Sequence, residues 1–134
     1  MDMPSCDMSI QSSQDVVLVR QAVRQFAVKL GFSLVDQTKI VTAASELARN
    51  TLDYGGGGTV KVEALQDGMR RGLRLVFEDS GPGIPDIDLA LKDGYTTGGG
   101  LGMGLSGTKR LMNEFNIVSH VGEGTCVTIT KWKS

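Results

Sequence analysis

One stretch of this 134-residue chain, EDSGPGIPDIDLALKDGYTTGGGLGMGL at residues 78–105, narrows the choice of folds more than any other. It joins a predicted strand to a predicted helix, and it contains a carboxylate and several glycines in close succession. Glycine lets a backbone approach a ligand closely, and the N-terminus of a helix favours anionic groups. The stretch therefore indicates a site for a phosphorylated ligand, and we interpret the chain as one that acts on nucleotides.

The size and charge of the chain exclude several classes of protein. We expect one domain, residues 1–134, which is large enough to bury a core without disulfide or metal support. The formal net charge is −1 and both signs are spread along the sequence, so we expect no nucleic-acid partner. No segment has the roughly 20 apolar residues of a membrane span, and the N-terminus has no basic and apolar leader. We therefore expect a cytoplasmic protein with no membrane partner.

The first half of the chain predicts a short strand and two amphipathic helices. The strand is expected near residues 6–11. Apolar residues recur at helical spacing over residues 16–30, after a capping Ser12 and before a terminating Gly31. A second apolar arc runs from about residue 35 to 54. The glycines that follow it, GGGG, are expected to end that helix.

The second half predicts two hairpins separated by the glycine-rich stretch and a third helix. Alternating apolar residues flank an Asp67-Gly68 turn over residues 60–78, and again flank a GEG turn over residues 117–132. The third helix is expected over residues 105–115. The predicted order has two consecutive helices and two hairpins, rather than helices that alternate with single strands, and this order predicts an α+β fold. We expect a two-layer sandwich with a mixed, mostly antiparallel sheet and the helices on one face.

A first candidate cluster lies on the second predicted helix, in SELARN. Glu46 and Asn50 are four residues apart, so they project about 40° apart around the helix axis, at the edge of the apolar arc. They can face one cavity together. Taken alone, the pattern is better explained by an ordinary helix with two polar residues on its rim.

A second cluster is DSGPGI, at the end of the first predicted hairpin. Asp79 stands where the strand would stop, and a carboxylate there can accept a hydrogen bond from the amino group of a bound base. Gly81 and Gly83 permit a close approach of the backbone to a ligand. A tight turn without a ligand explains this composition equally well.

A third cluster is GGGLGMG, residues 98–104, directly before the third predicted helix. Converging glycine N–H groups and the positive end of a helix dipole favour phosphates. Gly102, Gly104 and Gly107 spell GxGxxG, but that dinucleotide-binding motif must follow a strand within a βαβ unit, which is missing here. The alternatives are a disordered surface loop and a lid over a ligand, and such a segment inside a compact domain favours the lid.

The order of these segments carries a family resemblance. SELARN, EDSGPGIPDI, KDGYTTGGGLGMGL with KRLMNEF, and GEGT resemble the N, G1, G2 and G3 boxes of the GHKL (Bergerat-fold) ATPases. Within that superfamily, the chain is most similar to the anti-sigma-factor kinases and to the RsbT-type serine/threonine kinases that switch bacterial stressosomes. The similarity extends over nearly the whole chain.

The resemblance implies roles for particular residues. Asn50 would ligate a Mg²⁺ ion that bridges the phosphates of ATP, and Glu46 would be the base for the attacking hydroxyl group. Asp79 would recognise the adenine amino group. The other residues that the resemblance places at the nucleotide are Gly81 and Gly83 in the turn, Gly100, Gly102, Met103, Gly104 and Leu105 at the lid, and Thr125 in GEGT.

Two departures from the family pattern concern the phosphates and the end of the N box. Some of these kinases carry an arginine before the final lid glycines, where this chain has Gly100 and Leu101, so Lys109 or Arg110 would have to compensate the charge. Tyr54 stands where many relatives have histidine. We interpret Tyr54 as a change in packing.

The resemblance also implies partners. The acceptor would be a seryl or threonyl hydroxyl on a STAS-domain protein of the RsbS or RsbR kind, and a later partner would be an RsbU-like phosphatase, activated by contact. An alternative is an anti-sigma factor that sequesters a sigma subunit, with ATP as a structural or regulatory ligand. A histidine-kinase catalytic domain is a third interpretation, less favoured because no dimerisation helix or phosphoacceptor segment precedes residue 1.

Overall fold

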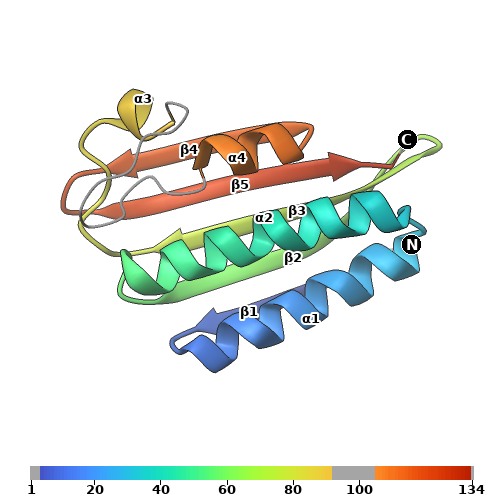
Figure 1. The fold of residues 1–134 in the computed structure, drawn as a ribbon, viewed down its shortest axis with the longest axis horizontal. Coiled ribbons are helices and arrows are strands. Elements are labelled where there is room, and N and C mark those ends of the chain that lie inside the picture. Colours follow the sequence, from blue (N-terminus) through green and yellow to red (C-terminus); the bar gives the residue numbers. More distant parts are fainter. Residues whose placement is uncertain (1–3, 92–104, 134) are drawn as a thin grey trace.

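The computed structural model of the chain describes residues 4–91 and 105–133, which form two layers (Figure 1). A five-stranded sheet forms one layer, and helices cover one of its faces. This confirms the predicted α+β sandwich. In chain order, the elements are β1 (Ser5–Ile10), α1 (Ser13–Leu30), α2 (Leu34–Asp53), β2 (Gly58–Asp67), β3 (Arg70–Asp79), α3 (Ile87–Ala90), α4 (Leu105–Leu111), β4 (Glu114–His120) and β5 (Gly124–Trp132).

The strand order in the sheet is β1-β2-β3-β5-β4. All pairings between the described strands are antiparallel, whereas the sequence predicted a mixed, mostly antiparallel sheet. Since β5 lies between β3 and β4, the start of β5 stands beside the end of β3, and Asp79 pairs with Thr125. The sheet order thus brings two candidate site residues together that are far apart in sequence.

Local sequence signals determine both ends of α1. The Ser12 hydroxyl accepts a hydrogen bond from the backbone N–H of Asp15 at 3.2 Å, which satisfies one of the donors that the first helical turn leaves unpaired. Gly31 closes the helix in a left-handed conformation with φ of 85°. The predicted helix start and stop are therefore confirmed.

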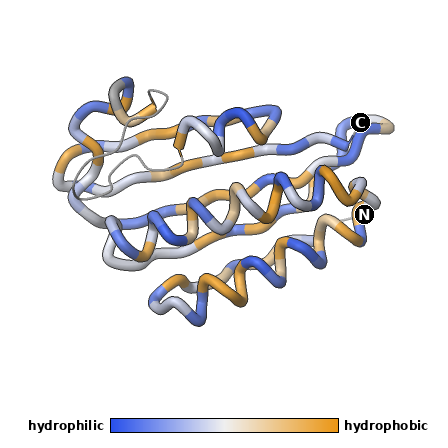
Figure 2. The backbone as a smooth tube through the Cα atoms, viewed as in Figure 1, coloured by the Kyte–Doolittle hydropathy of each residue, from blue (hydrophilic) through white to orange (hydrophobic). Residues whose placement is uncertain are grey.

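The core lies between the helices and the inner face of the sheet. Apolar stripes run along α1 and α2 in Figure 2, and the residues of these stripes that face the sheet are buried. Alternate residues of the central strands meet them, because successive side chains of a strand point to opposite faces. The fully buried strand residues include Val60, Val62, Leu73, Leu75, Phe77 and Ile129.

The predicted helix over residues 105–115 was too long. Helix α4 ends at Leu111, and strand β4 begins at Glu114 rather than near Ile117. Sheet pairing explains the difference: the backbone N–H of Asn113 donates to the Thr130 carbonyl at 3.0 Å, and Phe115 pairs with Ile129. Tertiary hydrogen bonds therefore override the helical spacing of these residues. The short helix α3 was not predicted.

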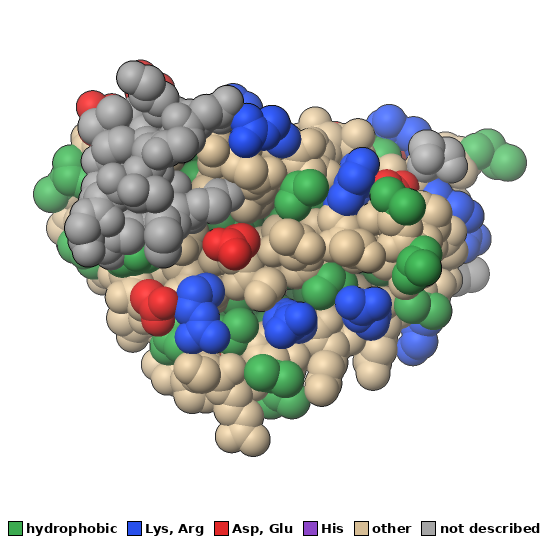
Figure 3. All heavy atoms as spheres, in the orientation of Figure 1, with side chains coloured by type: hydrophobic (Ala, Val, Ile, Leu, Met, Phe, Trp, Pro, Cys, Tyr) green, Lys and Arg blue, Asp and Glu red, His purple; other side chains and the backbone are tan. Residues whose placement is uncertain are grey.

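The part of the helix-bearing face that the described residues form carries no large uniform patch in this view. Figure 3 shows Lys, Arg, Asp, Glu and apolar side chains interspersed over α1 and α2. Within residues 4–91 and 105–133, no helix combines the length and the apolar character that crossing a membrane requires.

Candidate functional site

A hollow opens at the end of the sandwich where α2 and β3 end and β5 begins. The empty space between its walls is about 520 Å³, including open solvent at its mouth. Its walls are mostly apolar, with a few polar groups. The lining residues are Leu47, Asn50, Thr51, Tyr54, Gly55, Phe77, Asp79, Pro82, Gly83, Ile84, Leu105, Ile117, Thr125 and Val127.

Asn50 and Asp79 both line this hollow, although one comes from a helix and the other from a strand. Asn50 is in the last turn of α2, and Asp79 is the last residue of β3. Gly83, Leu105 and Thr125 line the same hollow. The four segments of the family resemblance, which are separated in the sequence, therefore each contribute a residue to the same hollow.

Asp79 offers an acceptor to a ligand. Its Oδ1 accepts a hydrogen bond from the backbone N–H of Gly81 at 2.9 Å, which orients the carboxylate and gives Gly81 a role in the turn. Oδ2 has no hydrogen-bond partner among the residues that the structure describes. Since the carboxylate is half-buried beside apolar walls, an external N–H donor would complete its hydrogen bonding.

Because nearby glycines have no side chain, there is room for the side chain of Asp79. A Cβ atom on Gly55 would overlap the Asp79 side chain, and one on Gly81 would come within 2.7 Å of the Gly55 Cα. A Cβ on Gly58 would overlap the Glu78 carbonyl group. The glycine run after α2 therefore does more than end the helix, which was the only role that the sequence predicted. It lets the end of α2 pack against the end of β3.

Glu46 lies one helical turn before Asn50 on α2. Its side chain is exposed and is not among the residues that line the hollow. The structure thus places Asn50 in the wall and Glu46 outside it, on the solvent side of the same helix. A carboxylate in this position is accessible to a second protein.

The other candidate residues lie near α4 or outside the described part of the chain. Leu105, the first residue of α4, is buried and lines the hollow. Lys109 and Arg110 are exposed in the last turn of α4. Gly100, Gly102, Met103 and Gly104, together with the predicted lid, lie outside the described residues.

The end of strand β4 contributes a residue, Ser119, that was not predicted from the sequence. The Oγ atoms of Ser119 and Thr125 are 2.7 Å apart, and the backbone N–H of Ile84 donates to Ser119 Oγ at 2.8 Å. A usable signal was present: Ser119 continues the inward-facing positions Phe115 and Ile117, where a third apolar residue would be expected.

The chemical character of the lining is compatible with a planar base that carries an amino group. Apolar side chains such as Leu47, Ile84 and Val127 suit the faces of a planar base, while the Asp79 carboxylate suits an amino group at its edge. The described residues contain no group of three His, Cys, Asp or Glu side chains that could hold a metal ion. Asn50 can offer one neutral oxygen, which fits a Mg²⁺ ion that takes its other ligands from water and phosphates.

Comparison with known proteins establishes the class. Residues 35–134 match the family described as histidine kinase-, DNA gyrase B-, and HSP90-like ATPase. The chain belongs to this ATPase family, and the predicted GHKL fold is confirmed. A nucleotide is therefore its expected ligand.

The relatives narrow the class further. The chain is 50% identical over 123 residues to the serine/threonine-protein kinase RsbT of Bacillus subtilis (strain 168), covering 92% of each chain. It is 34% identical to an anti-sigma F factor of Clostridium kluyveri, covering 91% of this chain and 89% of the relative. The predicted similarity to RsbT-type serine/threonine kinases is thus confirmed, and the chain is an enzyme of that kinase type.

Solved structures support the fold alone. The RsbU and RsbW domains of Rv1364c from Mycobacterium tuberculosis superpose with a TM-score of 0.61 at 19% identity, covering 96% of this chain and 31% of that longer one. The mycobacterial sensor histidine kinase MprB superposes with a TM-score of 0.57 at 19% identity, covering 96% of both chains.

Proposed function

We propose that the chain is an ATP-dependent kinase, a single cytoplasmic domain, that phosphorylates a serine or threonine of a STAS-domain partner of the RsbS or RsbR kind. By releasing that partner it would become free to bind and activate an RsbU-like phosphatase, and so act as a switch in sigma-factor control. The observation that supports ATP chemistry most directly is that Asn50 and Asp79, from separate elements, line one hollow.

Asp79 would recognise the base. Its Oδ2 is available to accept from an exocyclic amino group, while Gly81 holds Oδ1 in place. Gly83 and Thr125 would shape the same end of the hollow, and Leu105 would close the side nearest α4. The lid residues Gly100, Gly102, Met103 and Gly104 would cover the phosphates.

Asn50 would hold the metal ion through its side-chain oxygen. When bound, Mg²⁺ would neutralise charge on the phosphates and orient them for transfer. Lys109 or Arg110 on α4 would supply additional positive charge.

Glu46 would orient the acceptor hydroxyl group and take its proton. Its exposure suits this role, because the acceptor belongs to another protein and must reach the site from outside. The single helical turn between Glu46 and Asn50 keeps the base close to the metal position.

The test is transfer of radiolabelled phosphate from ATP to a purified STAS-domain protein. Glu46→Gln should bind ATP with Mg²⁺ as the unmodified protein does, yet transfer no label. Asp53→Asn is the matched control, because Asp53 is also an exposed carboxylate near the end of α2, and this variant should transfer normally. Full transfer by Glu46→Gln would remove Glu46 from the proposed role.

A second candidate function is sequestration of a sigma subunit, with ATP as a structural or regulatory ligand. The 34% identity to an anti-sigma F factor favours it. Tight capture of a sigma factor together with no label on any STAS-domain protein would support sequestration over the kinase proposal.

A further inference from the structure

Ser119, on the inner face of β4, connects three parts of the hollow through one hydroxyl group. It accepts a hydrogen bond from the backbone N–H of Ile84 at 2.8 Å. It donates to the carbonyl oxygen of Gly124 at 3.1 Å. Its Oγ also lies 2.7 Å from the Oγ1 of Thr125. The turn of residues 80–84 after β3, called the base-recognition turn from here on, and the first two residues of β5 are therefore joined to β4 by a single side chain.

The protons of these groups can be arranged in one way that keeps all three hydrogen bonds. A serine hydroxyl has one proton and two lone pairs. The proton goes to Gly124, and one lone pair accepts from Ile84. The bond to Thr125 must then use the second lone pair, so Thr125 is the donor. In this arrangement the bond to Ser119 uses the only hydroxyl proton of Thr125, so the Thr125 oxygen acts toward a ligand only as an acceptor.

We propose that Ser119 is a positioning and specificity residue, which holds Thr125 as an acceptor so that the site selects 6-aminopurine over 6-oxopurine nucleotides. This inference rests on the proposed nucleotide function. Asp79 and Thr125 are direct partners across β3 and β5, so two acceptors stand side by side at one end of the hollow. The two protons of a 6-amino group can be donated to such a pair of acceptors. A 6-oxo group has no proton to donate and faces both acceptors with its own lone pairs.

Ser119 also fixes the position of the base-recognition turn. That turn is held to the β4–β5 turn by two backbone donors, Ile84 N–H to Ser119 and Gly122 N–H to the Pro82 carbonyl at 2.8 Å. The two turns pack so closely that a Cβ on Gly83 would overlap the His120 carbonyl group. Of the two hydrogen bonds, only the one from Ile84 ends on a side chain, that of Ser119. Removing the Ser119 hydroxyl group therefore breaks one of the two hydrogen bonds that hold the turns together.

The test compares binding of ATP and of inosine triphosphate, which carries a 6-oxo group, to four proteins by calorimetric titration. In Ser119→Ala, the Thr125 proton is released to turn toward the ligand. We expect ATP affinity to fall about tenfold, the effect of about one hydrogen bond, and the ATP-to-ITP preference to shrink by a similar factor. Ser119→Thr keeps the hydroxyl group and should retain the preference. Ser9→Ala, in exposed edge strand β1, should change neither affinity.

A second readout needs no nucleotide. Hydrogen exchange at the Ile84 amide in the ligand-free protein should become about tenfold faster in Ser119→Ala and stay unchanged in Ser9→Ala. Thr125→Val should remove the base preference to the same extent, and adding Ser119→Ala to it should cause no further loss of preference.

The outcomes separate this proposal from the kinase proposal. An unchanged ATP-to-ITP preference in Ser119→Ala would overturn the specificity role, even if Ile84 exchanges faster. Equal binding of both nucleotides by the unmodified protein would also overturn it, while leaving phosphate transfer possible. Loss of the preference on Ser119→Ala, in a protein that labels no partner, would support the Ser119 proposal and reject the kinase.

Discussion

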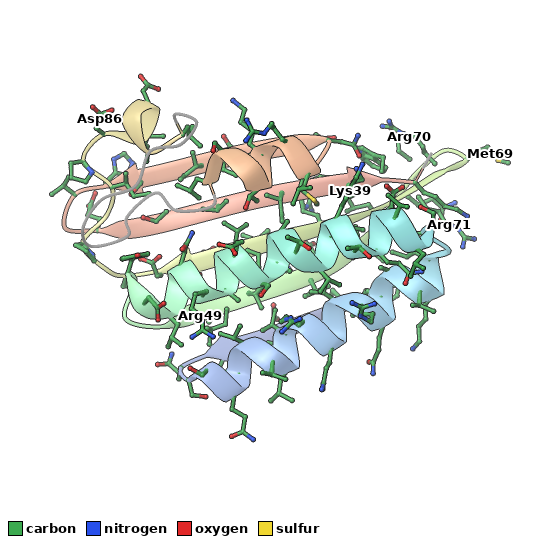
Figure 4. The ribbon with its side chains drawn as sticks, viewed as in Figure 1. Lys39, Arg49, Met69, Arg70, Arg71 and Asp86 are labelled. Atoms are coloured by element: carbon green, nitrogen blue, oxygen red, sulfur yellow. The ribbon has the colours of Figure 1, made fainter. Side chains whose placement is uncertain are left out.

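The two hairpin turns of the sheet have similar glycine-containing sequences and opposite surroundings. The β2–β3 turn projects into solvent at one end of the sandwich, where Figure 4 shows Met69, Arg70 and Arg71 pointing outward. A Cβ on Gly68 there would meet nothing within 4 Å. At the other end, the β4–β5 turn leads into Gly124, the first residue of β5, where a Cβ would overlap the Asp79 carbonyl group. A Cβ on Gly122, in the turn itself, would meet nothing within 4 Å. Glycine thus accompanies a chain reversal in both places, but only at Gly124 does it also make room for the site.

The largest effect is expected from alanine at Gly124. Gly124 has φ of 107°, and the added Cβ would collide with backbone that cannot move without displacing Asp79. Gly124→Ala should lower the free energy of unfolding by about 3 kcal/mol or more. Gly68→Ala, with φ of 63° in open space, should cost only about 1 kcal/mol. Urea denaturation of both variants tests the comparison, and equal losses would contradict it.

A smaller effect, on binding rather than folding, is expected from Asp79→Asn. The amide keeps an acceptor for Gly81 but places a donor toward the ligand's amino group, so ATP affinity should fall about 100-fold, or about 2.7 kcal/mol. Asp67→Asn is the control at the distal hairpin, where the carboxylate pairs with Arg70 at 3.4 Å. Titration with ATP should show no change for Asp67→Asn. Undiminished affinity in Asp79→Asn would contradict the role of Asp79.

A change near the distal turn should affect stability alone. The indole N–H of Trp132 donates to Glu114 at 2.6 Å, and the Arg70 guanidinium lies 4.1 Å from the ring centroid. Trp132→Phe keeps a ring but loses this hydrogen bond, so the unfolding free energy should fall by about 1 kcal/mol. Thermal unfolding measures that loss, and ATP titration should give the unmodified affinity. A weakened ATP affinity would show that the two ends of the sheet are coupled.

The smallest effect concerns a thiol beside the turn that forms the site. Burial, followed by the negative charges of Glu78 and Asp79, raises the pKa of Cys126. The folded protein therefore holds the thiol proton more tightly, and this contribution to stability declines as the pH rises above the unfolded thiol value of about 8.5. In a Cys6→Ser background, alkylation of Cys126 by iodoacetamide at pH 8 should be slower in the folded protein than in urea. Glu78→Gln should speed it slightly, and equal folded and unfolded rates would reject the shift.

Sequence periodicity and capping were sufficient to predict most of the fold. Ser12, Gly31 and the apolar stripes act within a few residues, so α1, α2 and the first hairpin were predicted with small errors at their ends. The end of α4 was missed because Asn113 and Phe115 bond to β5, about 15 residues further along the chain. Pairing between distant segments leaves no local periodic signal.

Some residues of the candidate site could also be predicted from the sequence, and others could not. The resemblance named Asn50 and Asp79, and the structure places both in one hollow. It gave no role to Gly55 or Ser119, because each acts through a segment elsewhere in the chain: the Asp79 side chain for Gly55, and the Ile84 backbone for Ser119. Steric and hydrogen-bond complementarity of this kind becomes visible only when the segments are placed together.

Strand register limits where this protein can change its length. Asp79 faces the hollow because it pairs with Gly58 on one side and Thr125 on the other. Since side chains alternate between the faces of a strand, one additional residue before Asp79 would turn its carboxylate to the opposite, helix-free side of the sheet. Insertions at the exposed β2–β3 turn leave that alternation intact. Extra segments, such as a fused reporter, therefore belong at residues 67–70, where the chain can be lengthened without moving the carboxylate.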